Sequence, residues 1–259
     1  MRSDDTMHID VQGSGPDLVL IHGWAMHGGI FAPLLQRLTP HFRVHAVDLP
    51  GHGYSHDDAH FELVDCAQRI AAATPRALWL GWSLGGLVAL RAALDEPAQV
   101  RGLGLIASSP RFVAAPDWPH GVAAGVFAEF ANELHARYRR AIERFLALET
   151  MGSMQAQSDL RELRRIVFER GEPSIEALAD GLRALDASDL RADVARLAMP
   201  SLWIAGRRDR LVPPGALQWA AAQAPHGRCL EYNSGHAPFL EHAAGIADAL
   251  VAFAAELPA

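Results

Sequence analysis

Residues 79–86 read WLGWSLGG, in which a serine has one glycine two positions before it and another two positions after it. A strand pattern, RALWLG at 76–81, leads into this stretch, and a helical pattern, LGGLVALRAALDEP at 84–97, follows it. On such a tight turn the serine hydroxyl projects away from the backbone, and larger residues in place of the two glycines would collide. The stretch therefore fits the G-x-S-x-G nucleophile elbow, with Ser83 as the candidate nucleophile. A plain strand-to-helix turn that contains a serine is the alternative.

Short apolar runs alternate with helical patterns around this turn, which is typical of a parallel sheet with crossover helices. The other strand patterns are DLVLIHG (17–23), RVHAVDLPGHG (43–53), VRGLGLIASSP (100–110), PSLWIAG (200–206) and RCLEYNSG (228–235), and a closing helix covers about 241–256. Between them, residues 111–193 carry only helical patterns, such as 121–149 and 158–170. The sequence predicts an α/β fold with a core at 1–110 and 194–259 and an inserted helical cap at 111–193.

The composition and charge exclude several classes of function. Half of the 259 residues are hydrophobic and one fifth are charged, which is ordinary for a soluble globular protein. The formal net charge of −7 argues against a nucleic-acid binder. All 23 basic residues are arginine, so Schiff-base, pyridoxal-linked and P-loop chemistry, which need a lysine, are excluded.

The termini and the cysteines indicate a location inside the cell. The charged amino-terminal stretch MRSDDTMHID has no apolar segment of the secretory type, and no run approaches the roughly 18 apolar residues of a membrane span. Cys66 and Cys229 lack metal-ligand spacing, and we expect buried thiols in a reducing compartment. We therefore expect a cytoplasmic protein, a monomer, with no membrane partner.

A serine nucleophile needs a base that takes its proton and an acid that orients the base. In proteins with this elbow the order along the chain is Ser, then Asp or Glu, then His. Asp209 follows the strand pattern at 200–206, and His236 lies in a glycine-preceded turn before the last helix, so the order is satisfied. The rivals are His242, which falls inside the last helical pattern, and the acids at the end of the cap, Asp186 and Asp189.

Two backbone N–H groups are candidates for stabilising a developing oxyanion. The elbow places the N–H of Leu84 at the start of a helix, where it points toward that charge. The stretch LIHGWAMHGG (20–29) offers a second N–H from Trp24, whose side chain packs in the core under the alternative interpretation.

In these motifs the sequence resembles the α/β-hydrolase superfamily across nearly the whole chain. HGW, DLPGHGYS, GWSLGG, GRRDRLVPP and GHAPF occur in the order expected for that superfamily. The resemblance implies a mostly parallel central sheet, usually of eight strands, with flanking helices and a helical cap over the carboxyl ends of the strands.

A closer resemblance is to the pimeloyl-acyl carrier protein methyl ester esterase family of biotin synthesis, carried by GWSLGGLVAL, ERFLALETMGS (143–153) and GHAPF. It implies cleavage of a methyl ester from a pimeloyl chain held on acyl carrier protein, without metal or cofactor. The implied catalytic residues are Ser83, Asp209 and His236, with Trp24 and Leu84 lining the oxyanion and acyl site. The implied acyl-chain contacts are Phe145, Leu146, Ala147, Leu148 and Glu149. Glu149 departs from the pattern, because it places a charge where a neutral amide is expected.

Arginines on the cap are candidates for docking an acidic partner. Arg137, Arg140 and Arg144 share one face of a predicted helix, and Arg161, Arg164 and Arg165 recur in the next. Residues 134–170 hold eight arginines and five acids, a local excess of three positive charges that could steer and hold acyl carrier protein. The alternative is that these are solvated helix faces, partly neutralised by Glu143 and Glu162.

The predicted activity is therefore a two-step acyl transfer through an acyl-enzyme. Other serine hydrolases of the same fold, such as a short-chain esterase, a C–C bond hydrolase or a peptidase, would carry the same three residues. A non-catalytic hydrolase-fold receptor or carrier-protein-binding module is the alternative from a different class.

Overall fold

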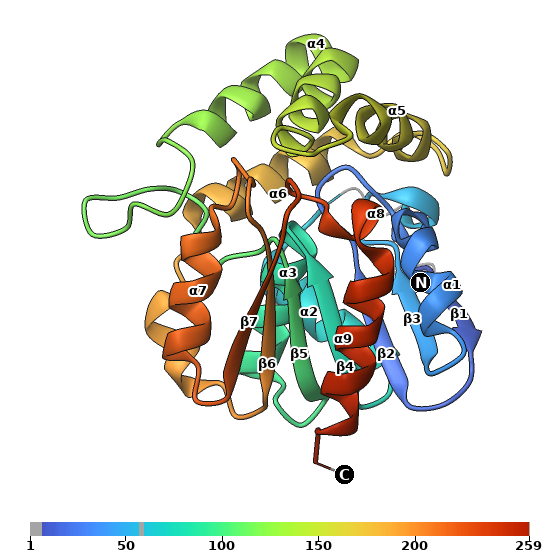
Figure 1. Ribbon diagram of the computed structural model, residues 1–259. Coiled ribbons are helices and arrows are strands. Elements are labelled where there is room, and N and C mark those ends of the chain that lie inside the picture. The colour runs from blue at the N-terminus through green and yellow to red at the C-terminus, as the bar shows by residue number, and fades with distance from the viewer. Residues whose placement is uncertain (1–6, 57–59, 259) are drawn as a thin grey trace.

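The strand that leads into the predicted elbow, β4 (Ala77–Trp82), lies at the centre of a seven-stranded sheet in the computed structural model, which describes residues 7–56 and 60–258 (Figure 1). The strand order is β1-β3-β2-β4-β5-β6-β7. The first strand, β1 (Ile9–Gly13), pairs antiparallel with β3 (Arg43–Val47), and every other pair is parallel. The remaining strands are β2 (Asp17–Ile21), β5 (Val100–Ile106), β6 (Ser201–Gly206) and β7 (Gly227–Tyr232).

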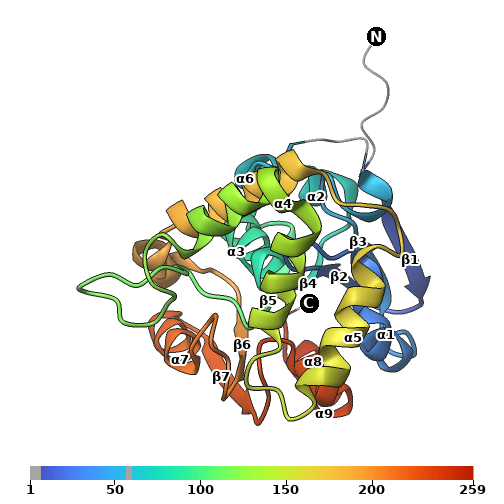
Figure 2. The same ribbon diagram turned by 90° about the horizontal axis from the view of Figure 1, so that it is seen from above.

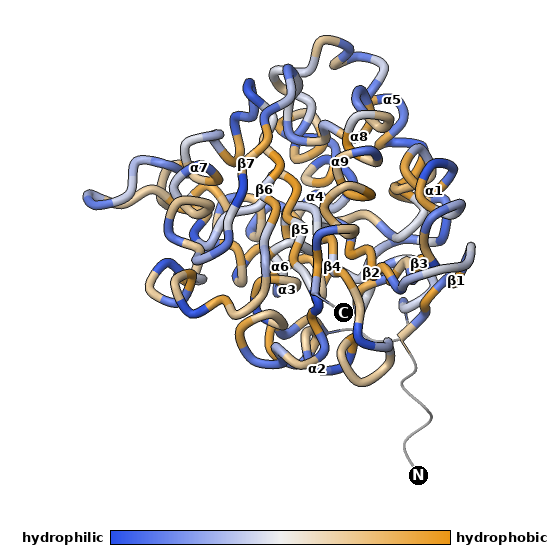
Figure 3. The backbone as a smooth tube through the Cα atoms, turned by 60° about the horizontal axis from the view of Figure 1, so that its bottom comes forward, coloured by the Kyte–Doolittle hydropathy of each residue, from blue (hydrophilic) through white to orange (hydrophobic). Residues whose placement is uncertain are grey.

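The central strands are apolar because both of their faces are covered. Every residue of β4 and of β6 is buried, as expected for parallel strands with helices on both sides. The edge strand β7 alternates between half-buried and exposed positions instead. The hydropathy colouring in Figure 3 follows this division, with the hydrophobic stretches gathered on the central strands.

Helices cover both faces of the sheet. On one face, α2 (Leu63–Ala73) packs against α3 (Leu84–Asp95), and α3 packs on β4 and β5. On the opposite face, α9 (Ala243–Ala255) lies beside α1 (Ala32–Leu38), in front of the sheet in Figure 1. The other core helices are α7 (Pro214–Gln223), α8 (Pro238–Glu241) and the short 3₁₀ helices at Gly28–Phe31, Gly53–Ser55 and Arg191–Arg196.

Three helices between β5 and β6 lie above the carboxyl ends of the strands (Figures 1 and 2): α4 (Val126–Glu149), α5 (Ala156–Val167) and α6 (Ile175–Ala187). We propose that they form the cap predicted at 111–193. The sheet bounds are close to the predicted strands, whereas β1, α1, α2 and α7 were not predicted. The sheet has seven strands among the described residues, rather than the eight usual for the superfamily.

Long-range hydrogen bonds tie these cap helices to the core. Trp24 donates from its indole Nε1 to the carbonyl of Leu178 on α6 at 2.8 Å. His27, through Nε2, donates to the carbonyl of Ile166 on α5 at the same distance. Arg170 forms an ion pair with the fully buried carboxylate of Asp48 at 3.1 Å. The cap therefore packs on the loops that follow β2 and β3, above the predicted site.

None of the helices in the described residues combines the length and the apolarity that a membrane crossing requires.

Candidate active site

Ser83 occupies a strained turn between β4 and α3. Its φ of 52° and ψ of −118° lie where side-chain-bearing residues rarely occur, which costs about 1–3 kcal/mol. Two hydrogen bonds hold the turn: the N–H of Ser83 donates to the carbonyl of Ile106 at 3.0 Å, and the hydroxyl of Ser108 donates to the carbonyl of Ser83 at 2.8 Å. Strain that the surrounding structure enforces at a single serine is typical of a nucleophile elbow.

The two glycines of the motif are required by the backbone that packs against them. A Cβ on Gly81 would lie 2.2 Å from the carbonyl oxygen of Gly85. A Cβ on Gly85 would lie 2.2 Å from the carbonyl oxygen of Ile21 on β2. These oxygens belong to α3 and to β2, and neither can move without shifting its helix or strand, so the steric reason inferred from the sequence agrees with these contacts.

The structure brings Asp209 and His236 to Ser83. The Nε2 atom of His236 lies 2.8 Å from the hydroxyl oxygen of Ser83, and its Nδ1 atom lies 2.7 Å from Oδ2 of Asp209. With Nδ1 donating to the carboxylate, Nε2 is left to accept the serine proton. All three side chains are buried. The arrangement is that of a Ser-His-Asp triad.

Neighbouring groups fix the acid and the base of this triad. Oδ1 of Asp209 accepts the backbone N–H groups of Leu211 and Val212 at 2.8 and 2.9 Å, so the carboxylate cannot rotate away from the histidine. The indole N–H of Trp82 donates to the carbonyl of His236 at 2.8 Å. The supporting roles of Trp82 and Ser108 were not predicted from the sequence, although both residues lie at the carboxyl ends of predicted strands.

The rival residues are engaged elsewhere. His242 caps the start of α9, one residue before its first turn, and its ring lies against Tyr232 with 5.2 Å between ring centroids. Asp189 forms ion pairs with Arg111 and Arg191. The third rival, Asp186, is exposed on α6.

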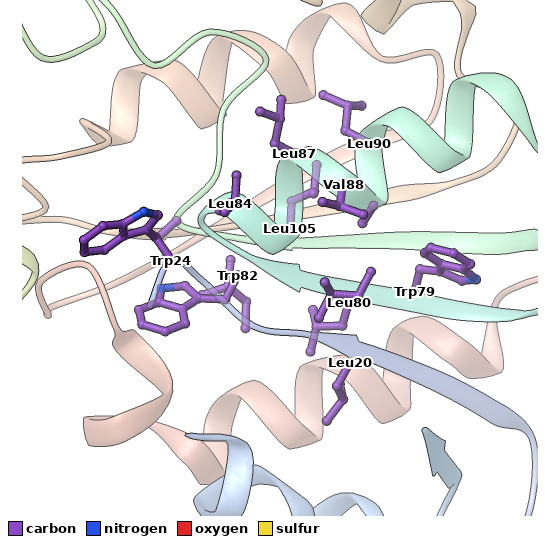
Figure 4. Close-up of a cluster of buried hydrophobic side chains, with 14 of the residues drawn as sticks. Leu20, Trp24, Trp79, Leu80, Trp82, Leu84, Leu87, Val88, Leu90 and Leu105 are labelled. Carbon is purple, nitrogen blue, oxygen red and sulfur yellow. The ribbon is translucent and has the colours of Figure 1, made fainter. Parts of the chain in front are cut away.

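Both predicted oxyanion donors are near the serine. Leu84 is the first residue of α3, and the first N–H groups of an α-helix have no acceptor within the helix. The loop that carries Trp24 passes close to the nucleophile, because a Cβ on Gly23 would lie 3.3 Å from the Cβ of Ser83. A Cβ on Gly181 of α6 would touch the side chains of both Trp24 and Leu84 at 3.1 Å. In Figure 4 these two side chains lie at the end of β4 beside Trp82.

The side chains of the predicted acyl-contact segment, 145–149, are partly buried in the protein and partly exposed to solvent. Phe145 is fully buried, with its ring 4.3 Å from the Trp24 ring and 5.3 Å from the Phe130 ring. Leu146 is fully buried and Leu148 is half-buried. Ala147 is exposed on the outer face of α4, so the structure does not bring it to the triad.

Glu149 carries a carboxyl group that is buried without a partner. Its exposed fraction is 1%, and neither carboxyl oxygen has a hydrogen-bond partner among the described residues. Burial raises the pKa of Glu149 well above its usual value, and the negative charge of Asp209 is the second cause of this shift. The residue that departs from the family pattern therefore lies near Asp209, in surroundings that disfavour its charged form.

The predicted face of three cap arginines is not continuous. Arg137 has φ −153° and ψ 59°, which kinks α4, so the expectation that Arg137, Arg140 and Arg144 share one face of a regular helix is wrong. Glu133 pairs with both Arg140 and Arg144, a role the sequence analysis gave to Glu143. On α5, Arg165 pairs with Glu162 and Glu169, whereas Arg161 and Arg164 are exposed.

Within residues 7–56 and 60–258, no group of three His, Cys, Asp or Glu side chains is arranged to hold a metal ion. Ser83, His236 and Trp24 are fully buried, so the cap closes the site off from solvent in this structure. The chemistry that this geometry supports is nucleophilic attack by a serine that is buried away from water.

The family model described as the alpha/beta hydrolase fold matches residues 16–243, and the chain belongs to that family. Its structure superposes on an esterase from Exiguobacterium antarcticum with a TM-score of 0.87, at 21% identity and with 96% of each chain covered. An enol-lactonase from Burkholderia xenovorans LB400 gives a TM-score of 0.83, at 22% identity and the same coverage. These two likenesses confirm the predicted fold.

The relatives found by sequence share a larger fraction of identical residues with this chain than these two structures do. The chain is 57% identical over 254 residues to the pimeloyl-[acyl-carrier protein] methyl ester esterase of Xanthomonas campestris pv. campestris (strain B100), with 97% of this chain and 100% of the relative covered. It is 56% identical over 253 residues to the enzyme of that name from Stenotrophomonas maltophilia (strain R551-3), with 97% of each covered. Within the α/β hydrolases, the chain belongs to the family of these esterases, which confirms the resemblance seen in its motifs.

Proposed function

We propose that this protein hydrolyses the methyl ester of pimeloyl-acyl carrier protein, releasing methanol and pimeloyl-acyl carrier protein in cytoplasmic biotin synthesis. The observation that carries the proposal is the 57% identity to an esterase of that name over that enzyme's whole length. The buried Ser83–His236–Asp209 arrangement supplies the chemistry that such an esterase needs.

The first step forms an acyl-enzyme. His236 accepts the Ser83 proton at Nε2 while the serine oxygen attacks the ester carbonyl. Asp209 holds the ring in the tautomer that can accept this proton and stabilises the imidazolium that results. The N–H groups of Trp24 and Leu84 stabilise the negative charge on the carbonyl oxygen. His236 then gives its proton to the leaving methoxide, and methanol departs.

The second step repeats this sequence with water. His236 takes a proton from a water molecule, whose oxygen attacks the acyl group on Ser83, and the collapsing intermediate returns the proton to the serine. The product ends in a carboxylate, whereas the substrate ended in a neutral ester. A further negative charge in a buried site beside Asp209 is unfavourable, so the product is bound less tightly than the substrate.

The interior around the nucleophile suits a methylene chain. Trp24, Phe145 and Leu146 are fully buried, and the two aromatic rings pack on each other. Burying a CH₂ group contributes about 0.8 kcal/mol, so a chain of several methylenes is held without polar contacts. Burial raises the pKa of Glu149, which disfavours a negative charge in this interior.

The carrier is an acidic partner in this proposal, and the exposed cap arginines are candidates for holding it. Arg140, Arg144 and Arg165 keep more than half of their side-chain surface exposed. Their pairing with Glu133, Glu162 and Glu169 means that a partner must compete with these acids, which weakens the contribution of each arginine. Arg137 and Arg161 are also exposed on the cap.

The test is to identify the bond that is cleaved. The substrate contains two acyl bonds, the methyl ester and the thioester to the carrier, and mass spectrometry of the intact carrier distinguishes them. Hydrolysis of the methyl ester leaves the carrier lighter by one methylene, whereas thioester cleavage removes the whole acyl chain. We expect the first product with wild type and neither with Ser83→Ala; thioester cleavage, or no reaction, would contradict the proposal.

A further inference from the structure

Ser108 follows β5 and lies against the nucleophile elbow, although its side chain is not part of the triad. It is 1% exposed, and its hydroxyl donates to the carbonyl of Ser83 at 2.8 Å. A Cβ on Gly86, in the first turn of α3, would lie 2.4 Å from the Cβ of Ser108. The second glycine of GWSLGG, which the G-x-S-x-G motif does not require, therefore leaves room for Ser108 to approach the elbow.

The backbone just before Ser108 is strained. Ala107 has a φ of 45°, in the left-handed region that residues with a side chain rarely adopt. Its N–H donates to the carbonyl of Ile204 on β6 at 2.8 Å, so the neighbouring strand holds this conformation in place. Strained residues of this kind gather at functional sites. The strain at Ala107 ends β5 immediately before the serine that contacts the elbow.

The carbonyl of Ser83 and the N–H of Leu84 belong to the same peptide group. Because a trans peptide is planar, its C=O and N–H point in opposite directions, and fixing the oxygen also fixes the direction of the N–H. The oxygen accepts the N–H groups of Gly86 and Leu87 at 2.9 and 3.2 Å, and the hydroxyl of Ser108 at 2.8 Å. The two N–H groups belong to α3 itself. The hydroxyl comes from the end of β5, so it ties this peptide group to the sheet.

We propose that Ser108 is a positioning residue for oxyanion stabilisation: its hydroxyl holds the peptide group between Ser83 and Leu84 so that the Leu84 N–H points at the carbonyl oxygen of the substrate. The inference rests on the proposed function, in which that N–H stabilises the oxyanion. A hydrogen bond to the peptide oxygen also polarises the group and makes its N–H a better donor. Both effects are largest in the transition state, when the substrate oxygen carries negative charge.

The first test is the kinetics of Ser108→Ala with two esters, the methyl ester of pimeloyl-acyl carrier protein and p-nitrophenyl butyrate. We expect kcat/KM to fall by roughly three- to tenfold, and by the same factor for both esters, because the oxyanion donor serves any ester. Ser108→Cys, which places a weaker donor at the same position, should lose less. A larger loss with cysteine than with alanine would show that packing against Gly86 sets the rate, and it would overturn the inference.

The matched control is Thr74→Val. It removes another buried hydroxyl that donates to a carbonyl, that of Ile70, at 2.7 Å. Thr74 lies just before β4 begins at Ala77, at the opposite end of this strand from Ser83. We expect the control to keep the wild-type kcat/KM for both esters. An equal loss in the control and in Ser108→Ala, or no loss in Ser108→Ala, contradicts the inference.

The second test separates positioning from packing by comparing a transition-state analogue with the substrate. A trifluoromethyl ketone reacts with the triad: the oxygen of Ser83 bonds to the ketone carbon, the proton moves to His236, and the ketone oxygen becomes an alkoxide. We expect its Ki to rise in Ser108→Ala by the factor by which kcat/KM falls. The Kd of the carrier-bound methyl ester, measured in Ser83→Ala with and without Ser108→Ala, should stay the same. A Kd that rises as much as Ki, or an unchanged Ki, would show that Ser108 does not act on the oxyanion.

Failure of the inference and failure of the proposed function are distinguishable. If the wild type hydrolyses the carrier-bound ester and Ser108→Ala does so equally fast, only the role of Ser108 is wrong. If the wild type hydrolyses p-nitrophenyl butyrate but not the carrier-bound ester, the proposed substrate is wrong, and the role of Ser108 is decided on the small ester, with the Kd measured for that ester. If the wild type hydrolyses neither ester, both fail. A loss in Ser108→Ala that is confined to the carrier-bound ester overturns the inference alone.

Discussion

The backbone N–H of His236 donates to the carbonyl of Glu149, the last residue of the cap helix α4, at 3.3 Å. The side chain of His236, the base of the triad, is therefore hydrogen-bonded to Ser83 and Asp209. Its backbone is hydrogen-bonded to the cap. Because the carboxyl group of Glu149 is also buried beside Asp209, one residue joins the cap, the acid and the base. We therefore expect that a movement of α4 would shift the position of His236.

Asp209→Asn tests how the triad works. An amide in place of the carboxylate cannot accept the Nδ1 proton from His236 in the same way, so the ring loses the tautomer that accepts the serine proton. We expect kcat to fall by about 10⁴ with little change in the fold, because the amide oxygen can still accept the N–H groups of Leu211 and Val212. Steady-state kinetics and circular dichroism check this, and near wild-type kcat would show that another residue orients the base.

Glu149→Gln tests the buried carboxyl group through the pH dependence of stability. The folded protein holds this proton to a higher pH than the unfolded chain, whose carboxyl has a pKa near 4.5, so unfolding releases a proton in the window between the two pKa values. The wild type should therefore lose stability, relative to the glutamine variant, as the pH rises from about 4.5 through the raised pKa.

The measurement is the Tm of the two proteins from acid to neutral pH, with Glu143→Gln as the control. Glu143 lies on the same helix but is exposed. The difference in Tm between wild type and the Glu149 variant should change steadily with pH, and the control should show a much smaller change. A constant difference for Glu149→Gln would mean that its carboxyl titrates alike in the folded and unfolded states.

Gly81→Ala tests the packing of the elbow. The added methyl group would lie 2.2 Å from a backbone oxygen of α3, and relieving that contact means shifting a helix on the central strand. We expect a loss of roughly 3 kcal/mol in the free energy of unfolding, measured in urea. Ser83→Ala, which removes only a hydroxyl from the same turn, should unfold at nearly the wild-type urea concentration; equal losses in both variants would refute the steric explanation.

Arg170→Met tests the connection between cap and core. It leaves the fully buried carboxylate of Asp48 without its cation, although the N–H groups of Gly28 and Tyr54 still donate to it. Removing one partner of a buried ion pair costs about 3–5 kcal/mol. We expect the free energy of unfolding, measured in urea, to fall by most of that amount. Adding Asp48→Asn should recover part of it, because the uncompensated charge is then gone. No recovery in the double variant would show that Arg170 acts by packing on Tyr54, over which its guanidinium lies at 4.8 Å.

The elements that the sequence predicted are those with strong local signals. The central strands are unbroken apolar runs, and the serine, the acid and the base each follow such a run in a fixed order. The strand β1 was missed because IDVQG is short and mostly exposed at the sheet edge. The kink at Arg137 leaves no trace in the sequence, since the helical periodicity continues through it. The pairing of Arg144 with Glu133, eleven positions away, depends on that kink and could not be read from i, i+4 spacing.

The proposed function is tested by measuring kcat/KM for the methyl ester of pimeloyl-acyl carrier protein and for free monomethyl pimelate, in wild type and in Ser83→Ala. We expect a strong preference of the wild type for the carrier-bound ester, and a loss of roughly 10⁴–10⁶ in kcat for both esters in the serine variant. Equal turnover of both esters by the wild type would leave a serine esterase without the proposed partner. Activity that survives in Ser83→Ala would show that Ser83 is not the nucleophile.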